Sequence, residues 1–335
     1  MKAVLVTGAG GFVGARVVKA LRRAGIESII GVGRSPVGPE GLDHYVCCDL
    51  AKEFDLKAKL AQASAVIHLA ARVHVMHEQA VDPAKAFHHA NVEATARLAA
   101  QAASAGVERF IFASTIKVNG ERTHGRQFTA NDLSAPEDEY ARSKAMAEVE
   151  LAKIAVESNT MSSTILRPPL IYGARASANF AALMRLTAHV PVLPFGAIHN
   201  RRSFIHVDNF AEALVTAALN PQQPGSNKIY MICDAVPVST PDLVRALANG
   251  MGRRPILIPV PVAWLRAFGA AVGKSAAVSR LTDDLETACD AFAADFDWKP
   301  HYGPIEGLKQ AGAAWVRVRA VGEQRSAVAP PHVAP

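Results

Sequence analysis

A tyrosine and a lysine stand four residues apart in the sequence "YARSK", as Tyr140 and Lys144. The stretch follows Pro136 and reads as a helix. Positions i and i+4 share one face of a helix, so the phenol and the ammonium can meet beside one ligand. A free phenol titrates near pH ~10, and a neighbouring cation favours its phenolate. The pair could therefore act as an acid or a base near neutral pH.

Three glycines, Gly8, Gly11 and Gly14, form the sequence "VTGAGGFVG" between the first apolar run and the first helical pattern. Glycines at this place let the backbone turn tightly and approach a pyrophosphate, whose charge the free N–H groups of the helix can bind. Because the triplet lies at the start of a strand-helix-strand unit, it predicts a dinucleotide site. A purely structural turn is the alternative.

The second apolar run ends in Gly33 and Arg34, where an acid that binds a ribose would be usual. Glycine removes the carboxylate that would repel a 2′-phosphate, and arginine can bind that phosphate. The pair therefore favours NADP(H) over NAD(H). The alternative is a solvated arginine in a surface loop.

Short runs of β-branched residues alternate with helical patterns through the first half of the chain. In the helical stretch 15–25, Val17, Val18 and Leu21 share one face and Gly25 ends the pattern. Alternation of this kind predicts an α/β fold with a Rossmann-type, doubly wound parallel sheet. The expected strands are Ala3–Val6, Ser28–Val32, His44–Cys47, Ala65–Leu69 and Arg109–Ala113.

The pattern loosens from about Pro168, with proline clusters and weaker strands. We expect residues 1–166, joined by 203–222, to form a dinucleotide-binding domain. Residues 167–202 and 223–320 would form a smaller α+β domain. Residues 321–335 lack periodicity and are expected to be a disordered tail.

Composition points to a globular enzyme or binding protein that takes a small anionic ligand. Of the 335 residues, 50% are hydrophobic, and the formal net charge is +6. The lysines and arginines are scattered, which suits a small anion better than nucleic acid. The four cysteines imply no disulfide framework and therefore a reducing compartment. The first apolar run is shorter than a signal-peptide core, so we expect a cytoplasmic protein.

One apolar stretch, "PILIPVPVAW" at 255–264, is too short and too rich in proline for a membrane-spanning helix. It is interpreted as a packed element of the second domain. The alternative is a peripheral membrane patch that includes Trp264 and Leu265.

No metal site is expected. His74 and His77 lie three apart, but no cysteine or acid pattern completes a ligand set. The pair His88 and His89 reads as the surface of a helix.

The glycine triplet, the hydroxyls Ser114 and Thr115 after the fifth expected strand, and the Tyr140 helix together resemble the extended short-chain dehydrogenase/reductase family. The likeness covers nearly the whole chain and is strongest to the nucleotide-sugar 4-epimerases and 4-ketoreductases, the group related to NAD-dependent epimerases and dehydratases. Further matches are "CDL" at 48–50 and "HLAA" at 68–71. The resemblance implies cofactor binding by Gly8, Gly11, Phe12, Val13, Gly14, Arg34, Asp49, Leu50, Leu69, Ala70, Ala71, Asn91, Tyr140, Lys144 and Pro168.

The same resemblance implies a catalytic set of Thr115, Tyr140 and Lys144. The family's hydroxyl stands five residues before the glycine of a Val-x-Gly ending, which selects Thr115 before Gly120 and leaves Ser114 as the competing residue. Thr115 would hold the sugar oxygen while Tyr140 exchanges its proton. Lys144 would also hold the nicotinamide ribose.

Family members that eliminate water carry an Asp-Glu pair after this hydroxyl, because dehydration needs an acid and a base besides the hydride step. Here the two positions are Ile116 and Lys117. The resemblance therefore implies hydride and proton transfer without dehydration. Lys117 would contact a substituent of the sugar, or else face solvent.

The implied substrate is a nucleoside-diphosphate sugar. In "RPPLIYGARASANF", Asn179 and Phe180 would start a helix beneath the diphosphate, although Pro169 replaces an asparagine of several epimerases. In "PFGAIHNRRSFIHVDN", Phe195 would pack by the base and Arg202 would bind the diphosphate, unless Arg201 and Arg202 are a solvated pair. Implied substrate residues are Ser114, Lys117, Asn179, Phe180, Phe195, Arg202 and Arg280.

The leading hypothesis is an NADPH-using reductase of a 4-keto sugar nucleotide. A 4-epimerase that retains bound NAD uses the same catalytic residues and is the main alternative. A small-molecule carbonyl reductase and a non-catalytic dinucleotide sensor on the same fold are further ones. The family likeness implies a homodimer packed through helices around 83–106 and 137–158.

Overall fold

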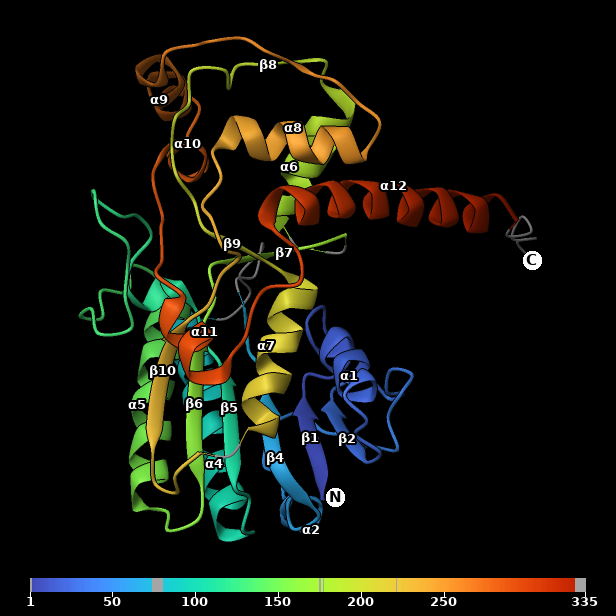
Figure 1. Ribbon diagram of the computed structural model, residues 1–335, viewed down its shortest axis with the longest axis vertical. Helices are drawn as coiled ribbons and strands as arrows, with labels where there is room; N and C mark the ends of the chain where they lie inside the picture. The colour runs from blue at the N-terminus through green and yellow to red at the C-terminus, as the bar shows by residue number, and fades with distance from the viewer. Residues whose placement is uncertain (1, 74–80, 175, 177, 221, 329–335) are drawn as a thin grey trace.

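The computed structural model describes residues 2–73, 81–174, 176, 178–220 and 222–328. A sheet with helices on both faces makes up the lower part of the view in Figure 1. A second group of helices and short strands lies beyond the end at which the sheet strands finish.

The sheet has seven strands, all parallel, in the order β10-β6-β5-β4-β1-β2-β3. The predicted doubly wound α/β fold is therefore confirmed, and the five expected strands are present with small shifts at their ends. The strand order reverses between β1 and β4, and ligands of such sheets bind beside that point at the carboxyl ends of the strands. The strands are β1 (Ala3–Thr7), β2 (Ile29–Gly33), β3 (His44–Cys47), β4 (Ala63–His68), β5 (Arg109–Ala113), β6 (Ser162–Arg167) and β10 (Asn227–Met231).

Helices bury both faces of the sheet, which explains why its strands read as continuous apolar runs. One face packs on α1 (Gly14–Arg23), α7 (Val207–Leu219) and α11 (Asp290–Phe296). The other packs on α2 (Lys57–Leu60), α4 (Ala94–Ser104) and α5 (Glu139–Glu157). On α1 the buried side chains are Val17, Val18 and Leu21, as predicted.

The outer group has a smaller core around Tyr172, Leu247 and Leu308. Its strands pair as β7 (Leu170–Tyr172) with β9 (Phe204–His206) and as β8 (Val192–Leu193) with β11 (Ile256–Leu257). Its helices are α6 (Ala178–His189), α8 (Thr240–Gly250), α9 (Val262–Ala271), α10 (Ser275–Thr282) and α12 (Pro304–Val328).

The structure divides the chain differently from the expected boundary at residue 223. Strand β10 pairs with β6 inside the large sheet, and Phe292 and Phe296 of α11 pack in the sheet core with Trp298. Segments 227–231 and 290–298 therefore belong with the sheet, because their apolar side chains complete its edge and one of its faces.

The C-terminal segment also differs from its expectation. Helix α12 continues to Val328, so residues 321–328 of the expected disordered tail are helical. These residues lack an apolar stripe and so carry no helical periodicity, but no proline interrupts the sequence between Pro304 and Val328.

Cys233 and Cys289 are far apart in the sequence, and far from Cys47 and Cys48, but they lie side by side in the fold. Cys233 follows β10 and Cys289 precedes α11, and their Sγ atoms are 2.7 Å apart. All four cysteines are free thiols in the structure.

Candidate active site

The glycine loop joins β1 to α1 at the carboxyl edge of the sheet. Gly8 has a φ of +67°, a conformation that other residues rarely adopt. A Cβ on Gly14 would lie 2.2 Å from the carbonyl oxygen of Gly8, so only glycine fits there. Within the described part of the chain, no acceptor is bonded to the N–H groups of Phe12 and Val13, which precede α1. The loop therefore fits the pyrophosphate of a dinucleotide.

Thr7 connects this loop to the turn after β4, a link that the sequence analysis missed. Its Oγ1 lies 2.6 Å from Nδ1 of His68 and accepts hydrogen bonds from the N–H groups of Leu69 and Ala70, both at 3.1 Å. Burial lowers the pKa of His68 to about 3, so its ring is neutral. Leu69 and Ala70 of the "HLAA" turn therefore stand beside Gly8, with Ala71 following them.

Asn91 lies in a π-helical turn, η1 (His88–Glu93), between α3 (Pro83–Phe87) and α4. Its amide accepts from the N–H of Arg72 at 2.7 Å and donates to the Arg72 carbonyl at 2.9 Å and to Ser143 Oγ at 2.8 Å. These bonds fix the chain after the "HLAA" turn against α5. Asn91 thus supports the cofactor-side wall through its neighbours, and π-helical turns of this kind often occur at functional sites.

The residues expected near the adenosine lie at the ends of β2 and β3. Arg34 follows β2 with its side chain exposed. Asp49 accepts from the N–H of Ala51 at 3.1 Å, and Leu50 is buried in the core. The structure brings this group to the same edge of the sheet as the glycine loop, because the strands are parallel.

Helix α5 presents Tyr140 and Lys144 to the end of β5. Asp138 caps the helix by accepting from the N–H of Ala141 at 2.7 Å. Nζ of Lys144 donates to the Ala113 carbonyl at 2.7 Å and lies 4.2 Å from the centre of the Phe112 ring. Because Ala113 is the last residue of β5, Lys144 stands next to Ser114 and Thr115. Helix α5 therefore holds Lys144 at the end of β5, next to the turn that carries Ser114 and Thr115.

Burial governs the ionisation of this cluster. It lowers the pKa of Lys144 to about 7, against an opposing effect of the Glu148 carboxylate. Burial also raises the pKa of the Tyr140 phenol, and the charge of Asp138 raises it further. The sequence predicted that the charge of Lys144 favours the phenolate; in the structure, burial and the charge of Asp138 instead favour the neutral phenol.

A buried polar network beneath α5 separates the roles of the two hydroxyls. Ser114 Oγ donates to Glu148 Oε1, and Glu148 is paired with Arg167 through bonds of 3.0 and 2.5 Å. Arg167 also donates to Asn119 at 3.1 Å. Ser114 is thus committed to the protein interior.

Thr115 begins the short helix η2 (Ile116–Val118). Among the described residues, its Oγ1 accepts one long hydrogen bond of 3.3 Å, from the N–H of Lys117. The next N–H group, that of Ile116, donates to the Pro168 carbonyl at 2.8 Å, which places Pro168 beside this turn. Thr115 therefore keeps its own O–H for a ligand, in contrast to Ser114.

Lys117 is held by two carboxylates that sequence reasoning did not place near it. Its Nζ donates to Glu121 at 2.5 Å and to Asp138 at 2.6 Å. Burial acts to lower the pKa of Lys117, but these two bonds outweigh it and the pKa is raised. Lys117 is therefore paired with two carboxylates and only partly exposed, which the sequence did not predict. Asp138 could have been recognised in the sequence as the residue that caps the helix beginning after Pro136.

Arg202 and Arg280 come together on the outer wall of the site. Arg202 donates to the Asp283 carbonyl at 2.9 Å and forms no ion pair with a carboxylate of the described residues. Burial lowers its pKa to about 10, the charges of Asp283 and Glu121 oppose this shift, and the charge of Arg280 adds to it. Arg201, by contrast, is exposed and pairs with Glu286 at 3.0 Å. The two neighbours are thus not a solvated pair, because only Arg201 is solvated.

The remaining substrate candidates belong to the outer core. Helix α6 begins where the sequence predicted it, so Asn179 lies in its first turn. Phe180 is buried against Tyr172, with ring centres 5.9 Å apart. Phe195 packs with Leu193 and Ile198. Both phenylalanine side chains are buried, so they support the wall of the site from within and expose little surface to a ligand.

His74 and His77 lie outside the described residues. Among the residues described, no group of three histidine, cysteine or acidic side chains could hold a metal ion. His88 and His89 lie on the surface of η1 and both bind Glu93, at 3.2 and 2.7 Å.

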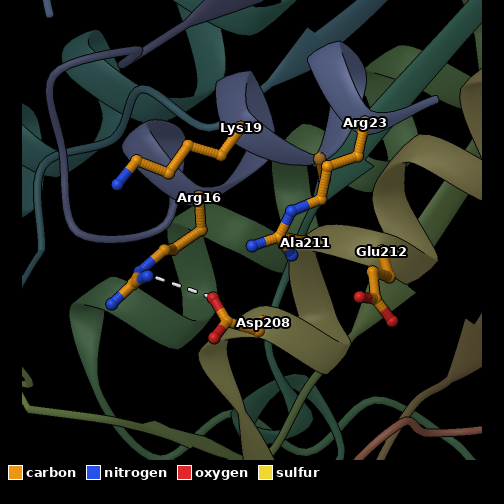
Figure 2. A pocket seen from close by; sticks show the side chains of 7 residues that line it. Arg16, Lys19, Arg23, Asp208, Ala211 and Glu212 are labelled. Carbon is orange, nitrogen blue, oxygen red and sulfur yellow. Dashed lines mark ion pairs between the residues drawn. The ribbon is translucent and has the colours of Figure 1, made fainter. Parts of the chain in front are cut away.

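A hollow between α1 and α7, drawn in Figure 2, lies away from this cluster. Arg16, Lys19 and Arg23 of α1 face Asp208 and Glu212 of α7, and Arg16 pairs with Asp208 at 3.4 Å. It contains none of the residues of the catalytic cluster, so the chemistry is assigned to the carboxyl edge of the sheet.

Comparison with known proteins gives consistent matches. Residues 4–233 match the model of the NAD dependent epimerase/dehydratase family. A UDP-glucose 4-epimerase of Vibrio cholerae is 36% identical over 318 residues, which cover 94% of this chain and 96% of that protein. An N-acetyl-alpha-D-glucosaminyl-diphospho-ditrans,octacis-undecaprenol 4-epimerase of Escherichia coli O157:H7 is 27% identical, over 79% of this chain and 78% of that one. The solved structure of MoeE5 in complex with UDP-glucuronic acid and NAD aligns with a TM-score of 0.74 and 25% identity, over 95% and 99% of the two chains.

Proposed function

The chain belongs to the NAD dependent epimerase/dehydratase family, and on that premise we propose that it is a 4-epimerase of a nucleoside-diphosphate sugar that works with bound NAD. The Vibrio cholerae relative, with 36% identity over nearly the full length of both chains, supports epimerisation. The complex of MoeE5 with UDP-glucuronic acid and NAD supports the choice of ligands.

One observation carries the proposal. Nζ of Lys144 is held 2.7 Å from the last carbonyl of β5, which brings α5 against the strand end that bears Thr115. We take Thr115, Tyr140 and Lys144 to act as one cluster at the edge of the sheet where the glycine loop also lies. A proton-transfer group beside a dinucleotide site is the arrangement that hydride transfer to and from a sugar carbon requires.

The residues divide the chemistry as follows. NAD, when bound by the glycine loop, supplies a hydride acceptor and donor at its nicotinamide. Tyr140 removes the proton of the sugar 4-hydroxyl during oxidation and returns it during reduction. Thr115 holds the same oxygen by a hydrogen bond, and Lys144 favours the deprotonated phenol when it is charged. Arg202 and Arg280 bind the diphosphate.

Dehydration is not proposed. Ile116 is buried, and two carboxylates beside this turn, those of Glu121 and Asp138, are paired with Lys117. Neither is free to act as the acid or base that water elimination needs.

We propose NAD as the cofactor, in place of the NADP that Gly33 and Arg34 favour. The solved relative described above contains NAD and gives no support to NADP as the preferred cofactor. Arg34 is nevertheless exposed at the end of β2, where it could bind a 2′-phosphate. That position is the specific reason to keep an NADPH-dependent 4-ketoreductase as the second candidate.

The released cofactor tests the choice between these two functions. The purified protein is denatured, and the supernatant is analysed for dinucleotide by mass spectrometry. An epimerase returns its hydride to the same substrate and should release close to one NAD per chain. A protein that comes without dinucleotide and takes up NADPH would support the reductase and contradict the epimerase.

We also propose a homodimer that packs through α4 and α5. The side chains of Met146, Val149 and Val156 on α5 are 47%, 54% and 68% exposed, which leaves apolar surface available for a second copy. Light scattering after size-exclusion chromatography should give twice the mass of 35.5 kDa. A monomer at micromolar concentration would contradict this.

A further inference from the structure

Helix α9 carries a row of exposed apolar side chains at the end of the molecule farthest from the sheet (Figure 1). Trp264, Phe268 and Val272 follow one another at intervals of four residues, so they share one face. They are 72%, 69% and 49% exposed. We call these three residues the α9 face. Two adjacent aromatic side chains this exposed are unusual for a surface that meets only water.

The neighbouring strands add further exposed apolar residues. Ile256 of β11 pairs in register with Val192 of β8, and the two are 63% and 43% exposed. Ile258, two residues further along, is 41% exposed and therefore lies on the same side of the chain as Ile256.

The opposite side of this segment is packed into the protein. Leu257, Val262 and Leu265 pack against the cluster of Leu193, Phe195 and Ile198. The segment is therefore a folded, amphipathic element and not a loose loop. Leu265 is packed, as expected for an element of the second domain, whereas Trp264 is exposed, so the alternative of a peripheral membrane patch stays open.

The sequence segment that carries the α9 face is basic. Residues 252–282 contain five basic residues and no acidic one: Arg253, Arg254, Arg266, Lys274 and Arg280. Arg266 is paired with Asp283 at 2.7 Å, whereas Arg253, Arg254 and Lys274 are exposed beside the apolar residues. A second copy of the chain would bring the same cations against one another in a two-fold contact, so this charge disfavours a dimer through the face.

We propose that the α9 face docks on an anionic membrane surface. Tryptophan and phenylalanine side chains favour the boundary between headgroups and acyl chains, and basic residues beside them attract anionic headgroups. A short amphipathic helix with both features lies in the plane of the interface and does not cross the bilayer. In keeping with this geometry, no helix in the described ranges has the length and apolar character to span a membrane.

Vesicle binding tests the proposal with the full-length protein. The protein is mixed with vesicles of phosphatidylcholine alone, or of phosphatidylcholine with a third of phosphatidylglycerol, and the bound fraction is measured by co-sedimentation. Binding should require the anionic lipid and weaken as salt is added. The double variant Trp264→Ser, Phe268→Ser should bind at least about tenfold more weakly, because two aromatic side chains no longer leave water. Each of Arg253→Gln and Lys274→Gln should weaken binding about fivefold.

A matched control separates the face from general surface hydrophobicity. Val37 and Leu133 are 79% and 90% exposed but lie outside the basic segment. The double variant Val37→Ser, Leu133→Ser should bind anionic vesicles like the wild type. Turnover of a water-soluble sugar nucleotide should be unchanged by Trp264→Ser, Phe268→Ser, which shows that the variant is folded.

Two results would overturn the proposal. The first is an absence of wild-type binding to the anionic vesicles, or equal binding by the Trp264→Ser, Phe268→Ser variant. The second is a wild-type dimer that becomes a monomer in that variant by light scattering, because the face would then be a contact between copies of this chain.

Discussion

The buried network of Arg167, Glu148 and Asn119 forms the floor of the site, whereas Arg202 stands half-buried in its outer wall, and the two arginines have different partners. Arg167, in the floor, bonds twice to Glu148 and once to Asn119. Arg202, in the wall, donates to one backbone carbonyl and has no ion-pair partner in the described chain. Burial lowers the pKa of Arg202 to about 10.

The difference indicates which charges hold the fold and which are available for a ligand. A buried ion pair with all its hydrogen bonds made is fixed, and breaking it costs stability. A buried cation without a counterion costs free energy that an anionic ligand can recover. The Arg167–Glu148 pair therefore holds α5 and its reactive residues in place, whereas Arg202 is available to bind a diphosphate.

The largest expected effect is a loss of turnover on substitution of Tyr140, a change that leaves the fold intact. Tyr140→Phe removes only the hydroxyl that exchanges the proton, so kcat should fall by a factor of about 10²–10⁴. Thermal unfolding should be nearly unchanged. Tyr230→Phe is the matched control, because that hydroxyl binds Asp295 at the far edge of the sheet and should leave kcat intact. A Tyr140→Phe enzyme within threefold of the wild type would refute the assignment.

A large loss of stability is expected from the floor network. Glu148→Gln leaves Arg167 charged and buried without its partner, so urea unfolding should show a loss of about 3–5 kcal/mol. Glu150→Gln, in the same helix, breaks only an exposed pair with Lys153 and should cost less than about 0.5 kcal/mol. Equal losses in the two variants would mean that the floor is not more tightly held than the surface.

The wall should respond in substrate affinity. Arg202→Ala removes the unpaired cation and should raise KM for a sugar nucleotide about 10- to 100-fold, with a smaller change in kcat. Arg201→Ala removes the exposed neighbour and should leave KM within about twofold. If KM is the same for Arg202→Ala as for the wild type, the substrate carries no diphosphate, and a small-molecule carbonyl reductase becomes the better description.

The smallest expected effect on stability is a gain in the free energy of unfolding when Lys144 is replaced, together with a loss of activity. Lys144 has a pKa of about 7 when folded, against an ordinary value of 10.5, so the folded state releases its proton first as pH rises. The penalty for burying the charge is therefore complete below pH 7 and fades towards pH 10.5. Lys144→Met should be more stable than the wild type by about 1–3 kcal/mol at pH 6.5, less so at pH 9, and inactive. A variant that is less stable at pH 6.5 would contradict the assigned ionisation.

The sheet and its cofactor edge could be predicted from the sequence because their signals are local. The apolar runs at β1 to β5, the glycine triplet and the Tyr140 helix can each be recognised from about ten consecutive residues. The parallel order of strands then brings them to one edge without further information.

The partners of the reactive residues could not be predicted in the same way. Glu148 reads as one more acid on a helix, and only the approach of β6 to α5 gives it Arg167 and Ser114. The side chain of Thr7 bonds to His68, about sixty residues later in the sequence, and Lys117 bonds to Asp138 on the far side of a loop. Such contacts between distant segments leave no periodic trace.

The most direct test of the proposed function is a proton NMR assay with UDP-glucose and UDP-N-acetylglucosamine and no added cofactor. The epimerase proposal predicts that one of these sugars is converted to its C4 epimer, up to a constant ratio, and that Tyr140→Phe abolishes the conversion. A wild-type protein that leaves both sugars unchanged, yet oxidises NADPH in the presence of a 4-keto sugar nucleotide, would contradict it.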